Sequence, residues 1–68
     1  MTVIEFLELF IDPDSQQFEI WSNEREEVLF IGYLTDIPDD RNDELLQAEV
    51  SSIDNIQYEG DCITINID

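Results

Sequence analysis

Carboxylates are the only side chains in this sequence that are abundant enough to suggest chemistry, and residues 36–47 hold the densest run of them. Asp40-Arg-Asn-Asp-Glu44 places oxygen ligands at alternate positions, as the start of a calcium-binding loop does. Such a loop needs glycine at its sixth position to turn the chain, and Leu45 stands there instead. Asp12-Pro-Asp14 fails at the next ligand position. We therefore predict no specific metal site.

The residue types also argue against catalysis. Histidine and lysine are absent, which removes the commonest general base and the residue that forms Schiff bases. Cys62 has no basic neighbour in the sequence to lower its pKa, so we expect an inert, partly buried thiol. Among eighteen acids, carboxylate pairs arise by chance, and a catalytic pair also needs a pocket that a small core leaves little room for. We predict that the protein is not an enzyme and binds no cofactor.

The chain length allows one domain spanning residues 1–68, of which 43% are apolar. Area scaling predicts that folding removes about 60% of the chain's surface from water, which is enough for a marginal core. No apolar run reaches the length of roughly 18 residues that a membrane span needs. The first residues also lack the basic stretch of a signal peptide. We therefore expect a cytoplasmic protein.

Residues 2–11 are predicted to form a helix. Thr2 and Glu5 have the spacing of a capping box, and Pro13 is expected to end the helix. The apolar residues recur at helical spacing, with Ile4, Leu9 and Ile11 widening the apolar face set by Val3, Phe6, Leu7 and Phe10.

Two strands follow. Residues 17–22 alternate apolar Phe18 and Ile20 with polar residues, which predicts a half-buried strand. After a polar turn, residues 27–35 form the most apolar run, which predicts a strand covered on both faces. Gly32 within that run indicates a bulge or a close contact.

The second half of the chain begins with an acidic loop at residues 36–47. We expect it to carry one or two helical turns from Asp43 to Gln47, with Asn42 as the helix cap. Residues 48–58 are predicted to be a weaker strand with a bulge or a kink, because Ile53 has the opposite parity to the other apolar residues.

A turn at Gly60 is predicted to lead into the last strand. In that strand Ile63, Ile65 and Ile67 are expected to face inward, while Thr64 and Asn66 face out. The resulting fold class is α+β, with an N-terminal helix packed on a small, mostly antiparallel four-stranded sheet. The pattern does not predict the strand order.

Charge is the strongest functional signal, because eighteen acids against two arginines give a net charge of −16. Nucleic acids and anionic membranes are therefore poor direct partners, and a basic protein surface is the natural one. A domain of 68 residues is expected to be about 28 Å across, and duplex DNA of that length also carries roughly 16 negative charges. Mimicry of DNA, however, requires the acids to gather on one face of the domain. The candidates for that face are Asp36, Asp39, Asp40, Asp43 and Glu44 in the loop and Glu24, Glu26 and Glu27 in the first hairpin turn.

Two other interpretations of the acids remain open. In the first, the acids serve solubility alone, on solvated loops and strand edges. In the second, they are an adaptation to a halophilic cytosol. Under the first interpretation, the leading alternative is a structural or assembly protein that self-associates through exposed strands. Salt-sensitive binding to basic partners distinguishes an interaction protein from this alternative.

The chain resembles the very small acidic accessory proteins of phages and mobile elements, especially those of Gram-positive hosts. The resemblance is carried by Thr2-Val-Ile-Glu-Phe-Leu-Glu-Leu9, the Ile37-Pro-Asp-Asp40 loop and Val50-Ser-Ser-Ile-Asp54 before a short last strand. Some acidic members of that group, including anti-CRISPR and anti-restriction inhibitors, occupy the nucleic-acid channel of a host defence enzyme. The resemblance thus implies a non-enzymatic inhibitor in the bacterial cytoplasm whose partner is a nucleic-acid-handling enzyme. It is one of size, charge and layout, and it assigns no functional residue.

Overall fold

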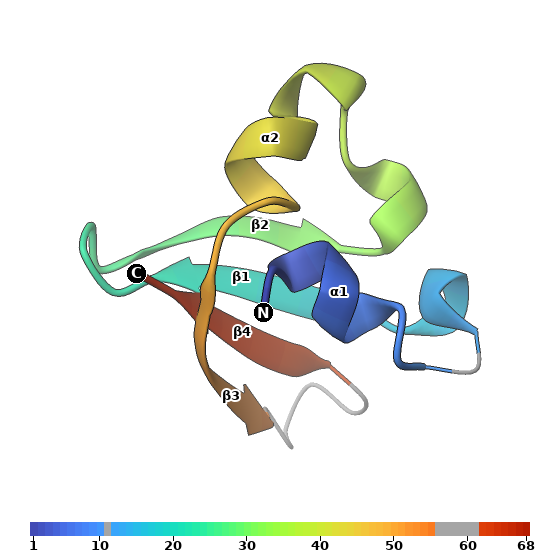
Figure 1. Cartoon of the computed structure of the whole chain (residues 1–68), viewed down its shortest axis with the longest axis horizontal. Coiled ribbons are helices and arrows are strands. Elements are labelled where there is room, and N and C mark those ends of the chain that lie inside the picture. Colours follow the sequence, from blue (N-terminus) through green and yellow to red (C-terminus); the bar gives the residue numbers. More distant parts are fainter. Residues whose placement is uncertain (11, 56–61) are drawn as a thin grey trace.

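The computed structural model describes residues 1–10, 12–55 and 62–68. Figure 1 shows short helical elements packed on a sheet. The elements in chain order are α1 (Val3–Leu7), η1 (Pro13–Ser15), β1 (Phe18–Ser22), β2 (Glu27–Gly32), η2 (Leu34–Asp36), η3 (Asp39–Arg41), α2 (Asn42–Leu45), β3 (Val50–Asn55) and β4 (Ile63–Ile67), where η marks a 3-10 helix.

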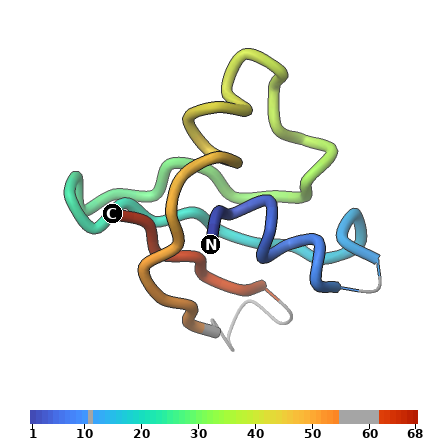
Figure 2. The backbone as a smooth tube through the Cα atoms, viewed as in Figure 1, coloured from blue at the N-terminus to red at the C-terminus, as the bar shows by residue number. Residues whose placement is uncertain are grey.

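The strand order in the sheet is β2-β1-β4-β3. β1 pairs with β2 and β3 pairs with β4 in antiparallel fashion, while the central pair, β1 and β4, is parallel. The connection from 33 to 49 passes from the β2 edge to the β3 edge, which places the two hairpins side by side (Figure 2). The predicted α+β class with a mostly antiparallel four-stranded sheet is confirmed.

Helix α1 begins as predicted but ends early. The Thr2 hydroxyl accepts a hydrogen bond from the Glu5 N–H at 3.3 Å, and the Glu5 carboxylate accepts one from the Thr2 N–H at 2.8 Å. The prediction of a helix beyond Leu7 is wrong for residues 8–10, and residue 11 lies outside the described residues. Beyond Leu7 the chain tightens, with the Leu9 N–H donating to the Phe6 carbonyl. Leu9 consequently turns outward and is 70% exposed instead of widening the apolar face.

The hydrophobic core lies on one face of the sheet. β1 and β4 supply its floor, and α1 together with the 34–46 segment covers it. Helical spacing and strand alternation each give one apolar face per element, and these faces meet here. The buried residues of the core are Val3, Leu7, Phe18, Ile20, Ile37, Leu45, Ile65 and Ile67.

The prediction of a strand from 27 to 35 that is covered on both faces is wrong for β2. It ends at Gly32 and forms an edge of the sheet, where Val28 is 44% and Ile31 50% exposed. Its pairing with β1 is interrupted opposite Ile20/Trp21, which leaves Leu29 as an extra residue. Because the core lies on only one face and β2 is an edge strand, Val28 and Ile31 on the other face remain open to solvent.

The second hairpin also differs in part from its prediction. β3 spans residues 50–55, and its pairing shifts between Val50 and Ser52, which agrees with the predicted bulge or kink. Thr64 and Asn66 lie on the face opposite the isoleucines, but each is only 7% exposed. They are buried because β4 is a central strand with neighbours on both sides. The predicted strand residues 56–58 and the turn at Gly60 lie outside the described residues.

Candidate acidic binding surface

The acidic loop is a folded connection built from η2, η3 and α2. Ile37 and Leu45 point into the core and hold the connection on the sheet. The predicted helical turn is present, but it spans 42–45 and not 43–47. Asn42 is its first residue and not its cap, because Arg41 precedes the helix and η3 runs directly into α2. The two buried residues, Ile37 and Leu45, therefore determine the position of the acids in this loop.

Asp36 has a structural role in this loop. Its Oδ2 atom accepts a hydrogen bond from the Tyr33 N–H at 3.0 Å, which closes the η2 turn. Gly32 lies next to it with φ of +150°, and a Cβ added there would stand 3.1 Å from Asp36 Oδ2 and 3.3 Å from the Phe30 ring. The close contact predicted for Gly32 is confirmed.

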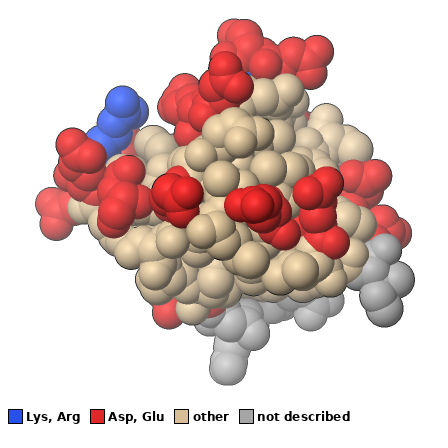
Figure 3. Space-filling model, in the orientation of Figure 1, with Lys and Arg blue, Asp and Glu red and all other residues tan. Residues whose placement is uncertain are grey.

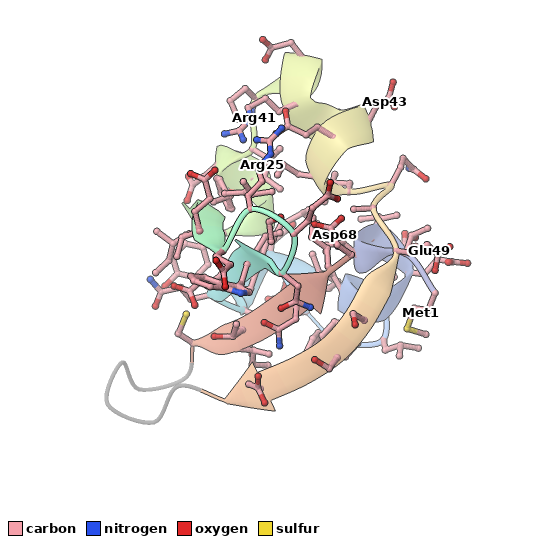
Figure 4. The ribbon with its side chains drawn as sticks, turned by 90° about the vertical axis from the view of Figure 1, so that its left-hand side faces the viewer. Met1, Arg25, Arg41, Asp43, Glu49 and Asp68 are labelled. Atoms are coloured by element: carbon pink, nitrogen blue, oxygen red, sulfur yellow. The ribbon has the colours of Figure 1, made fainter. Side chains whose placement is uncertain are left out.

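Arg41 links the loop to the sheet. Its Nη2 atom donates to the Leu29 carbonyl at 3.3 Å and to Glu44 Oε1 at 3.2 Å. Leu29 lies in β2, three residues after the turn at 23–26, so this contact holds the loop against the strand that leaves the turn. In Figure 4 Arg41 and Arg25 lie on the same side of the molecule, and Asp43 projects from α2 into solvent.

The β1–β2 turn is held by Ser22, which is 1% exposed. Its hydroxyl donates to Asp68 Oδ2 at 2.6 Å and accepts from the Arg25 N–H at 3.1 Å, and its carbonyl accepts from the Glu26 N–H at 2.8 Å. Glu26 takes a positive φ of 55° in this turn. These bonds keep the backbone in place while the glutamates of the turn point outward.

All eight candidate acids are exposed: Asp36, Asp39, Asp40, Asp43, Glu44, Glu24, Glu26 and Glu27. In the part of the chain that the structure describes, Glu44 is the only one of them in an ion pair. Figure 3 shows acidic side chains over the β1–β2 turn at the left and over η3 and α2 at the top.

The acidic surface extends beyond these two segments. A further row of acidic side chains crosses the middle of the view in Figure 3. Averaged over the accessible surface of 4325 Å², sixteen net charges give one per about 270 Å², against about one per 100 Å² on duplex DNA. The loop and the turn are two parts of a wider acidic coat (Figure 3).

Local hydrogen bonds shift the pKa values of two groups, the Glu5 carboxyl and the Met1 amine. Bonds from the Thr2 backbone and hydroxyl hold the pKa of Glu5 below its usual value. A hydrogen bond to Glu49, at 3.0 Å, and the charge of that carboxylate raise the pKa of the Met1 amine. Both groups lie outside the loop and the turn.

Sequence reasoning missed a second group of polar residues, on the face of the sheet opposite the core. Thr64 donates to Glu19 Oε1 at 2.9 Å, and the Asn66 amide donates to Asp54 Oδ2 at 2.8 Å and to the Ser52 hydroxyl at 3.1 Å. The alternation of Thr64 and Asn66 in β4 was the available signal. Their hydrogen-bond partners could not be predicted, because these lie on the neighbouring strands β1 and β3 and the strand order was not known.

Within residues 1–10, 12–55 and 62–68 the structure shows no pocket and no cluster of residues suited to a metal ion. Helices long and apolar enough to cross a bilayer are likewise absent from these residues. Comparison with protein-family models, with curated proteins and with solved structures finds no match for the chain.

Proposed function

We propose that this protein is a non-enzymatic interaction protein that binds a basic, nucleic-acid-binding surface of another protein and inhibits it by occupying that surface. The eight acids of the loop and the β1–β2 turn make the contact. The partner is the Arg/Lys-rich groove of a nucleic-acid-handling enzyme, in keeping with the resemblance to phage and mobile-element inhibitors. A charge of −16 steers such a partner and makes association fast and salt-sensitive.

The observation that carries this proposal is the combination of exposure and missing internal counter-charge. All eight carboxylates face solvent, and among the described residues seven of them have no ion-pair partner. Their backbone is nevertheless held in place, by Ile37 and Leu45 in the loop and by Ser22 in the turn. An ordered backbone lowers the conformational entropy that binding of a partner would cost.

Self-association is the competing function, because edge strand β2 exposes Val28 and Ile31. Sedimentation at several salt concentrations separates the two functions. A stable homo-oligomer at physiological salt without affinity for basic ligands would favour an assembly protein.

A charge-reversal experiment with a matched control tests the proposal. The variant Asp40→Lys/Asp43→Lys and the control Glu8→Lys/Asp14→Lys change the net charge equally, and all four side chains are exposed. We expect the loop variant to bind an oligo-lysine peptide about tenfold more weakly than the control does, because only the loop variant changes the contact surface. Binding of the unaltered protein should fall steeply from low to moderate salt. Equal effects of the two double variants, or binding that ignores salt, would refute this mechanism.

A further inference from the structure

The face of the sheet opposite the core has an organisation that differs from the acidic coat. The pairing places its residues in two rows across the four strands. One row is Ile31, Glu19, Thr64 and Asp54, and the other is Val28, Trp21, Asn66 and Ser52. We call these eight residues the open face.

One half of the open face is apolar. Val28 and Ile31 on β2 are 44% and 50% exposed, and Trp21 lies beside Val28 on β1, partly buried. The acidic turn at residues 23–26 adjoins this half, because it connects the two strands that carry these three residues. The turn carries Glu24, Arg25 and Glu26, so a net charge of −1 borders the apolar half.

The other half holds two carboxylates in set positions. Thr64, between Glu19 and Asp54 in the same row, donates to Glu19 at 2.9 Å, and Asn66 donates to Asp54 at 2.8 Å. Glu19 and Asp54 stand two strands apart, about 9–10 Å at the backbone, on either side of Thr64, which is 7% exposed. A guanidinium or ammonium group that contacts both carboxylates would therefore lie on the solvent side of Thr64. Neither carboxylate has an ion-pair partner within the described residues.

These observations point to a basic occupant and away from a second copy of the chain. Two copies packed face to face would each bring a net charge of −16 to the contact, and this repulsion opposes the pairing. A segment with both apolar and cationic side chains matches both halves of the face. A purely polar cationic segment would leave Val28 and Ile31 uncovered.

We propose that the open face docks a basic amphipathic segment of a partner protein. Its apolar side chains cover Val28, Ile31 and Trp21, and one of its lysine or arginine side chains contacts Glu19 and Asp54. This inference rests on the proposed function in one respect, namely that the partner is basic. It adds a second contact surface, which requires the partner segment to carry apolar side chains as well as basic ones.

Trp21 provides a direct readout, since it is the only tryptophan in the chain and lies on the open face. The probes are two synthetic peptides of equal length and equal lysine content. One carries leucines spaced to form an apolar helical face, and in the other those leucines are serines. We expect the leucine peptide to bind more tightly and to shift Trp21 emission to shorter wavelength. The serine peptide should bind at low salt and leave the emission unchanged.

Variants locate the contact. Val28→Ser/Ile31→Ser should weaken binding of the leucine peptide by about tenfold and leave the serine peptide unaffected. Leu9→Ser, which changes a 70% exposed leucine outside the open face, is the control. Glu19→Gln, with Glu8→Gln as its control, keeps a hydrogen-bond acceptor for Thr64 and should also weaken the leucine peptide. This second variant tests the face independently if the double variant does not fold.

The outcomes separate the two proposals. Equal binding of the two peptides, or leucine-peptide binding without a change in Trp21 emission, overturns the docking face and leaves the proposed function standing. Binding of the leucine peptide alone, with the emission shift, supports the docking face and refutes binding through the acidic loop. If neither peptide binds, both proposals fail. Concentration-dependent dimerisation that Val28→Ser/Ile31→Ser abolishes would also overturn the docking face.

Discussion

Replacing Leu45 with alanine tests whether the acidic loop is held in place by its apolar anchors. Leu45 is fully buried in the core, yet it belongs to a helix of four residues. Burial of an apolar residue therefore contributes more to the position of this segment than helix propensity can. Loss of the side chain should loosen the segment that carries five of the candidate acids.

The magnitude follows from burial. Leu→Ala at buried sites costs about 2–5 kcal/mol, from lost transfer free energy and the cavity left behind. A domain of 68 residues has a free energy of unfolding of roughly 3–10 kcal/mol. We expect Leu45→Ala to lower it by about 3 kcal/mol, a large share of the total. With a urea m-value of about 1 kcal/mol/M, the unfolding midpoint should fall by roughly 3 M.

Urea titration followed by Trp21 fluorescence measures this change. Leu9→Ala is the matched control, because it makes the same replacement at a 70% exposed position and should change stability by less than about 0.5 kcal/mol. Leu45→Met keeps the volume and should cost less than about 1.5 kcal/mol. Equal midpoints for Leu45→Ala and Leu9→Ala would refute the claim that Leu45 anchors the loop.

Two further predictions concern local geometry and pH. Gly32→Ala should lower the free energy of unfolding by about 1–3 kcal/mol, because φ is +150° and the new Cβ would stand 3.1 Å from Asp36 Oδ2; an unchanged urea midpoint would contradict this. The folded state lowers the pKa of Glu5, so the stability it contributes is fully present above the unfolded value of 4.5 and is lost as pH falls through the folded pKa. In acid-unfolding curves Glu5→Gln should lack this loss of stability, whereas the control Glu8→Gln should show it as the unaltered protein does. Identical curves for the unaltered protein and the two variants would exclude the capping box as the source of the loss.

Features that depend on neighbours in the sequence were predictable. The Thr2–Glu5 capping box, the alternation of Phe18 and Ile20 and the close contact at Gly32 follow from residues at most four positions apart. Charge was predictable in the same way, since carboxylates in polar loops face water wherever those loops lie. The exposure of the candidate acids therefore agrees with the sequence.

Features that depend on distant contacts were not predictable. β2 is an edge strand with Val28 and Ile31 open to solvent. Arg41 contacts the Leu29 carbonyl across twelve residues, and Ser22 bonds to Asp68 across forty-six. Such contacts require the strand order, and alternation within a strand says which residues share a face without saying which strand lies beside it.

The sequence by itself determined an α+β domain with a net charge of −16, four strands and an acidic loop. Tertiary structure decided that β1 and β4 pair in parallel at the centre of the sheet. That pairing buries Thr64 and Asn66, and it brings Glu19 and Asp54, thirty-five residues apart in the chain, into one row. The physical reason is that charge and alternation are properties of short segments, whereas the order of strands depends on which apolar faces can be buried together.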